Sequence, residues 1–139
     1  MGGEMGNGIS GAAVLRVASA MLAALGGDEI AVMLPATATA SDIGGLLGLV
    51  DPGVRTVTIK PVVARSLPTG NLGPRRRIEF TLPADVVAAQ LSELGMGSAA
   101  VLFDGALGLM YDSELFHIES VTAESFAGTQ YLYKVVAVE

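Results

Sequence analysis

The sequence contains no cysteine and a single histidine, and these two absences exclude several kinds of chemistry. Without cysteine there is no disulfide, no thiolate metal site and no cysteine nucleophile. A Ser-His-Asp triad would depend on His117, which lies between Phe116 and Ile118 in a strand-like stretch with no nucleophile elbow nearby. An outward strand position explains this histidine better. We therefore expect no catalytic residue, no metal ion and no cofactor.

Charge is also scarce, and basic charge most of all. Charged residues make up 16% of the chain, with 8 basic and 14 acidic side chains and a formal net charge of −6. Typical soluble domains carry about 25% charge. An acidic chain lacks the basic surface that phosphates and anionic lipids require. We expect no sequence-specific nucleic acid and no membrane among its partners.

Apolar residues, in contrast, make up 51% of the 139 residues. A chain of this length suits one domain, and such a domain has too little interior to bury all of its apolar surface. The surplus predicts burial against a partner. The alternative is that alanine and glycine raise the apolar count without forming an adhesive surface.

No targeting segment is predicted near the start of the sequence. Residues 9–25 are apolar, but Arg16 interrupts them and the run is too short to span a membrane. A secretory signal would have basic residues before the apolar run, whereas here Glu4 precedes it. We expect the protein to be made in the cytoplasm of the cell that produces it.

Glycine-rich segments divide the chain. Residues 1–8 contain four glycines and predict a flexible N-terminal arm, followed by a single β-rich domain over 9–139. Residues 36–53 predict a long loop, because they lack a regular pattern and end in the turn signature Asp51-Pro52-Gly53. Leucine side chains in this loop are costly to leave in water, and we expect them to pack on a neighbour: Leu46, Leu47 and Leu49.

Two helices are predicted. Ser10 is a suitable N-cap for a helix over 11–25, which has an apolar stripe at helical spacing and ends at Gly26-Gly27. Pro83 opens a second helix over about 84–94, and Gly95 ends it.

The remaining periodic segments predict strands. Short alternating or apolar runs occupy 29–34, 54–65, 78–82, 107–111, 115–121 and 130–138. Pro61 indicates an edge or a bulge in the second of these strands. The pattern predicts a β-rich α+β fold: a small β-barrel or sandwich with an N-terminal helix and one inserted helix.

Two charged clusters are candidates for a site. Acidic residues gather near the C-terminal hairpin, namely Asp104, Asp112, Glu114 and Glu119. Paired carboxylates can serve glycoside hydrolysis or bind calcium, although EF-hand spacing is missing and hairpin loops are commonly acidic. A small hydrolase or a ligand-binding barrel that uses this hairpin therefore stays open as an alternative.

The second cluster is Arg75, Arg76 and Arg77. It predicts either contact with a phosphate or an acidic partner, or a solvated entry to the next strand. Within a homo-oligomer, the hairpin residues Asp112 and Glu114 of a neighbouring copy are the natural acidic partner.

Several elements together resemble a known family. They are the helix ending at 25–27 with the strand 29–34, the alternation 77–82, and the segments 115–121 and 128–136. In this combination the chain resembles the small virion proteins of tailed bacteriophages that form the head–tail neck: connector, stopper and adaptor proteins. The resemblance implies a structural protein without catalytic residues, whose small β-barrel forms a ring.

The resemblance also implies where the protein acts and with what. Its location would be the virion, and its partners would be copies of itself and neighbouring portal, adaptor or tail proteins. The alanine and glycine richness and the loop at 36–53 fit a capsid decoration protein or a tail-terminator protein equally well.

Overall fold

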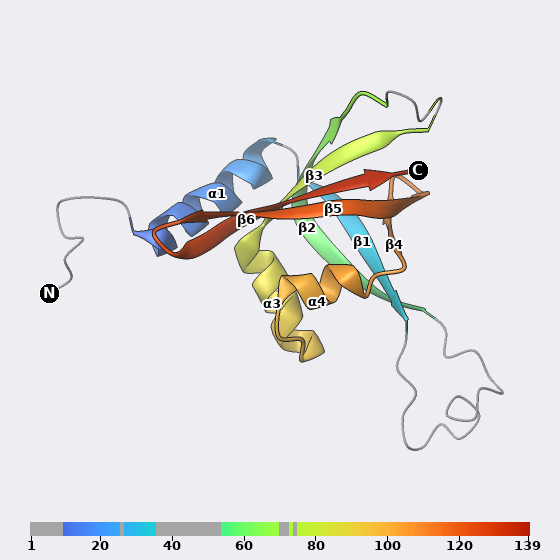
Figure 1. The fold of residues 1–139 in the computed structure, drawn as a ribbon. Helices are drawn as coiled ribbons and strands as arrows, with labels where there is room; N and C mark the ends of the chain where they lie inside the picture. The colour runs from blue at the N-terminus through green and yellow to red at the C-terminus, as the bar shows by residue number, and fades with distance from the viewer. Residues whose placement is uncertain (1–9, 26, 36–53, 70–72, 74) are drawn as a thin grey trace, which may run out of the picture.

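The computed structural model describes residues 10–25, 27–35, 54–69, 73 and 75–139. The predicted arm at 1–8 and loop at 36–53, with Leu46, Leu47 and Leu49, lie outside the described residues. The elements follow one another along the chain (Figure 1) as α1 (Gly11–Leu25), β1 (Asp28–Pro35), β2 (Val54–Ser66), β3 (Arg77–Pro83), α3 (Ala84–Leu94), α4 (Ala99–Asp104), β4 (Gly108–Tyr111), β5 (Glu114–Phe126) and β6 (Thr129–Val138).

The strands form a closed barrel in the order β1-β2-β3-β6-β5-β4, with every neighbouring pair antiparallel. The expected β-rich α+β fold with an N-terminal helix is confirmed, and of the two predicted architectures it is the barrel. Closure depends on distant pairing, because β1 pairs with β4 and β3 pairs with β6.

The interior of the barrel is filled by alternate side chains of the strands. Phe80 lies at its centre, with its ring 5.0 Å from Tyr111 and 6.2 Å from Phe116, both edge to face. Other fully buried side chains complete the core: Ile30, Val32, Ile59, Val62, Leu82, Val87, Leu102, Leu109 and Val135. Alternation along β1, β2, β3 and β6 places the apolar side chains of these strands inside, and α3 and α4 add Val87 and Leu102.

The two predicted helices form as expected. The Ser10 hydroxyl accepts a hydrogen bond from the Ala13 amide at 3.1 Å and so caps α1. Gly95, with φ of 69°, ends α3 in the left-handed conformation, and its amide bonds back to the last turn. Gly11 lets α1 approach the β5–β6 hairpin closely, because a Cβ there would lie 2.6 Å from the Thr129 Cβ.

The β4–β5 hairpin and the bulge in β2 lie where the predicted strands 107–111 and 115–121 and Pro61 place them. Asp112 and Ser113 join β4 to β5 with φ of 53° and 64°, as a tight two-residue turn requires. The Lys60–Pro61 peptide bond is cis, and the β1–β2 register shifts beside it, as expected of a bulge at Pro61.

Two features differ from the sequence prediction. The segment between α3 and β4 contains a second inserted helix, α4, whose Ser98 hydroxyl accepts from the Val101 amide at 3.3 Å. Its six residues are too few to show periodicity, and Leu102 and Phe103 hold it by burial in the core. In addition, β5 continues to Phe126, five residues beyond the predicted end at 121.

Candidate functional site

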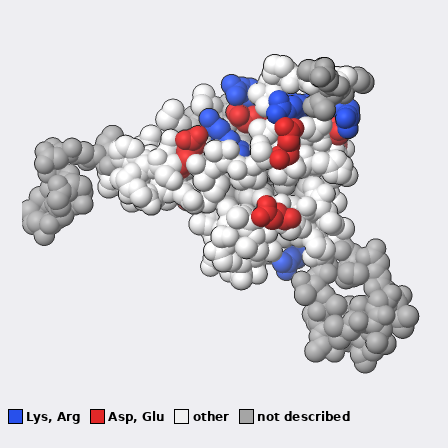
Figure 2. Space-filling model, viewed as in Figure 1, with Lys and Arg blue, Asp and Glu red and all other residues white. Residues whose placement is uncertain are grey.

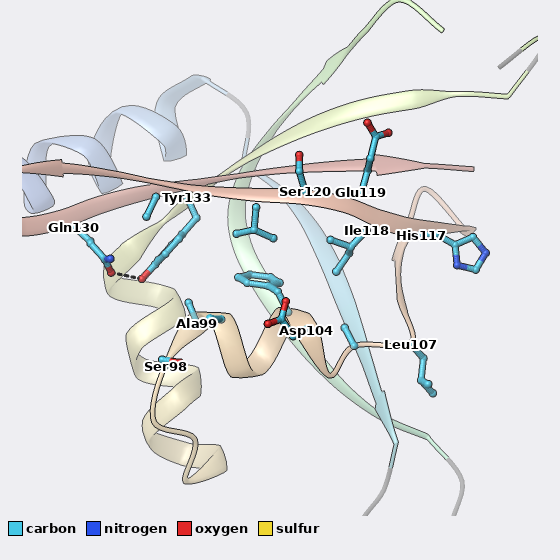
Figure 3. A pocket seen from close by; sticks show the side chains of 15 residues that line it. Ser98, Ala99, Asp104, Leu107, His117, Ile118, Glu119, Ser120, Gln130 and Tyr133 are labelled. Atoms are coloured by element: carbon cyan, nitrogen blue, oxygen red, sulfur yellow. Dashed lines mark hydrogen bonds between the residues drawn. The ribbon is translucent and has the colours of Figure 1, made fainter. Parts of the chain in front are cut away.

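An open groove of about 590 Å³ lies between α4 and β5. Figure 3 shows Gln130 and Tyr133 toward one end of it and Leu107 toward the other. Apolar lining comes from Phe103 on α4 and from Val121 and Ala123 on β5. The groove is thus bounded by a helix on one side and a strand on the other.

The polar groups at the Tyr133 end are already paired. The Tyr133 hydroxyl donates to Oε1 of Gln130 at 2.6 Å, as the dashed line in Figure 3 marks. Burial raises the pKa of this phenol above its ordinary value. Tyr133 therefore stays a neutral hydrogen-bond donor at neutral pH and anchors the wall of the groove.

Most charged side chains in the view of Figure 2 gather at one end of the barrel, near the start of β3 and the end of β6. Arg77 forms two hydrogen bonds with Glu119, at 3.2 Å from Nε and 2.7 Å from Nη2. This bidentate contact lowers the pKa of the Glu119 carboxyl. Nearby, Arg65 donates to Glu79 at 2.9 Å.

Arg76, at the same end of the barrel, contacts both an aromatic ring and a carboxylate. Its guanidinium lies 5.6 Å from the centre of the Phe116 ring, and its Nη1 lies 3.1 Å from Oε2 of Glu114. That contact is at ion-pair distance without hydrogen-bond geometry, and Oε2 of Glu114 is buried without a hydrogen-bond donor. The neighbouring Glu139 carboxyl lowers the pKa of Glu114, and the pKa of Glu139 is itself raised by Glu114.

The predicted arginine cluster is therefore placed beside the acidic hairpin of its own chain. Arg76 and Arg77 contact Glu114 and Glu119, whereas Arg75 is exposed on the surface. Asp112 lies in the exposed turn before β5. Whether these residues also contact a neighbouring copy stays a prediction.

The acidic residues do not converge on one cavity. Asp104 and Glu119 line the groove, whereas Asp112 and Glu114 are not part of its lining. His117 is exposed and lies at the rim of the groove, whose lining includes it, and Figure 3 shows its imidazole near the Leu107 end. Among the described residues, no three His, Cys, Asp or Glu side chains are grouped closely enough to hold a metal ion.

Apart from the groove, the helix α1 also carries an apolar surface that faces solvent. Val17 and Met21 are each 55% exposed and Leu25 is 71% exposed, at the spacing of one helical turn. The adjoining side of α1 packs on the protein through Leu15 and the buried Leu22. We call Val17, Met21 and Leu25 the apolar face of α1; Figure 2 shows few charged side chains over this helix.

The sequence did not predict the groove or the exposed apolar face of α1. It predicted the apolar stripe of α1, but periodicity does not show how much of a broad stripe the protein itself buries. The groove depends on α4, for which Ser98 was the only local signal.

No protein-family model, no curated protein and no solved structure matches the chain. Within the part of the chain that the structure describes, no helix has the length and hydropathy needed to cross a membrane.

Proposed function

We propose that this protein is a structural subunit that associates with copies of itself. The observation that carries the proposal is the apolar face of α1. The apolar stripe of α1 is broader than the part that the barrel covers, and an exposed apolar surface on a helix is typical of burial against a partner. Burial of this face against another copy would remove three large apolar side chains from water.

The particular assembly that we propose is the ring of a tailed-bacteriophage neck, in which the protein would act as a connector, stopper or adaptor. Two points support this assignment. The resemblance of the sequence is to that family, and the fold that it implies, a small β-barrel, agrees with the closed barrel. Its partners would be the adjoining copies and the portal, adaptor or tail proteins, and its location the virion.

Sedimentation velocity of the full chain tests the self-association. We expect the wild-type protein to sediment as a species several times larger than the 14.1 kDa chain, and Met21→Glu to shift it toward the monomer. Val101→Glu is the matched control, because Val101 is also exposed, at 54%, but lies on α4. A wild-type protein that stays monomeric over the accessible concentration range would overturn the proposal.

Electron microscopy distinguishes the neck from other assemblies. Closed rings that bind purified portal or tail-completion proteins would support a neck component. Association without rings, or binding to intact capsid surfaces, would support a decoration protein instead and overturn the neck assignment.

A further inference from the structure

One edge of β5 has no neighbouring strand over most of its length. β6 pairs with β5 from His117 to Phe126, whereas β4 pairs with β5 only through residues 114–116. Within the described part of the chain, no backbone hydrogen bond outside the β5–β6 ladder involves residues 117–126. Ten extended residues span roughly 33 Å; the β5–β6 register shifts at 118–120 and at 124–125, and between these shifts every second residue directs its N–H and C=O groups to the open edge.

The barrel has a second incompletely paired strand, and there the edge is covered. β3 pairs with β2 only through residues 63–66, which leaves residues 54–62 beyond the end of that ladder. Here α3 packs against β2, and Nε2 of Gln90 donates to the Thr58 carbonyl at 3.3 Å. No described side chain forms such a bond with the backbone of residues 117–126. Proteins ordinarily cover or charge a long open edge, because it pairs readily with another chain.

The groove lies beside this open edge. Phe103 on α4 faces the inward side of β5, where Val121 is 36% exposed and Ala123 also lines the groove. A strand added to β5 would direct alternate side chains toward this apolar lining and the others to solvent. An open strand next to a helix-walled apolar groove is the arrangement that binds extended peptides by strand addition.

The charged side chains that line the groove indicate which charge its occupant carries. Its described lining includes Asp104 and Glu119 and no lysine or arginine. Arg77 already neutralises Glu119, which leaves Asp104 as the charge available to an incoming segment. Asp104 is the last residue of α4, where a negative charge does not stabilise the helix.

We propose that the β5 edge from His117 to Phe126 and the adjoining groove bind an extended segment of a partner protein. The segment adds to the sheet as a strand, is apolar at alternate positions, and carries a lysine or arginine that pairs with Asp104. This surface is separate from the apolar face of α1, and the inference does not depend on self-association.

Amide hydrogen exchange of the full chain, measured by NMR, tests the inference with a synthetic probe. The probe is the acetylated, amidated peptide Thr-Val-Thr-Lys-Thr-Val-Thr, whose lysine lies on the same face of the added strand as its valines, and it should slow exchange about tenfold or more at the edge-directed amides of residues 117–126. A matched peptide with N-methyl groups at alternate backbone nitrogens keeps the side chains but loses the donors. We expect it to bind at least about tenfold more weakly.

Charge variants test the orientation of the segment. Asp104→Lys should weaken binding of the lysine peptide about tenfold and favour a peptide with glutamate at that position. Glu93→Lys makes the same change of charge on exposed α3, away from the groove, and should leave both affinities nearly unchanged. Met21→Glu, which tests α1, should also leave peptide binding unchanged, so failure of one proposal is distinguishable from failure of the other.

Four outcomes of the peptide experiments would overturn the inference. They are no binding up to about 1 mM peptide, equal affinity for the N-methylated peptide, protection that maps outside residues 117–126, and equal effects of Asp104→Lys and Glu93→Lys. Protection of residues 117–126 that depends on protein concentration without peptide would also overturn it, because the edge would then bind a second copy.

Discussion

The strand β5 consists of a part inside the barrel and a part beyond it, and one pair of identical substitutions separates the two. Phe116 is 0% exposed and packs edge to face on Phe80, while Phe126 is 45% exposed near the end of the strand. Phe116→Ala removes a fully buried ring and leaves a cavity. Phe126→Ala removes a ring that is only partly buried.

The expected losses of unfolding free energy differ severalfold. Phe-to-Ala substitution at a fully buried site costs about 3–5 kcal/mol, and loss of the aromatic pair places Phe116 toward the upper end. For Phe126 we expect about 1 kcal/mol, because roughly half of the burial of a phenylalanine is at stake and no closed cavity forms. The larger loss is a substantial fraction of the roughly 5–15 kcal/mol that stabilises a domain.

Urea denaturation followed by far-UV circular dichroism measures both values, since the chain has no tryptophan to serve as a fluorescent reporter. The midpoint should shift with little change in the denaturant slope. Equal losses for the two variants, or a loss below about 2 kcal/mol for Phe116→Ala, would refute the division of β5 into a core part and an open part.

Three further predictions concern the surface. Glu119→Gln should reduce the loss of stability between about pH 5 and pH 3. The pKa of Glu119 is lowered in the folded protein, so its carboxylate stabilises the fold above the pKa of the unfolded chain, and this stabilisation is lost as the pH falls. Unchanged acid denaturation would contradict this. Gly11→Ala should lower unfolding free energy by about 1–3 kcal/mol through overlap with Thr129, and an unchanged urea midpoint would refute the close approach. Replacing Arg75–Arg77 by glutamine should leave the melting temperature nearly unchanged but weaken assembly, most clearly at low salt. An unaltered yield of assembly across a salt titration would show that these arginines are solvated residues before β3 with no role in assembly.

Local signals predicted most elements of the fold. The Ser10 cap, the stop at Gly95 and the turn at Asp112 each depend on residues close in sequence, and each lies where it was expected. The pairing of β1 with β4 and the position of β6 between β3 and β5 depend on residues far apart in sequence. No local pattern carries that information, which is why barrel and sandwich could not be distinguished.

The candidate surfaces were predicted less well for a related reason. Arg76 and Arg77 were recognised as a cluster, but their contacts within the chain depend on the register of β3 with β6 and of β6 with β5. The open edge of β5 is defined by where β4 begins and ends. Its length follows from the position of α4, which the burial of Leu102 and Phe103 sets.

The placement of β6 between β3 and β5 has a consequence for synthesis on the ribosome. The last strand of the barrel to be made is inserted between two earlier strands and is also the main contact of α1, which precedes all of the strands. The apolar sides of the earlier strands therefore stay exposed to water until residues 129–138 have left the exit tunnel. Closure then joins segments separated by most of the chain, so we expect folding to be slow for a domain of this size, in milliseconds to seconds.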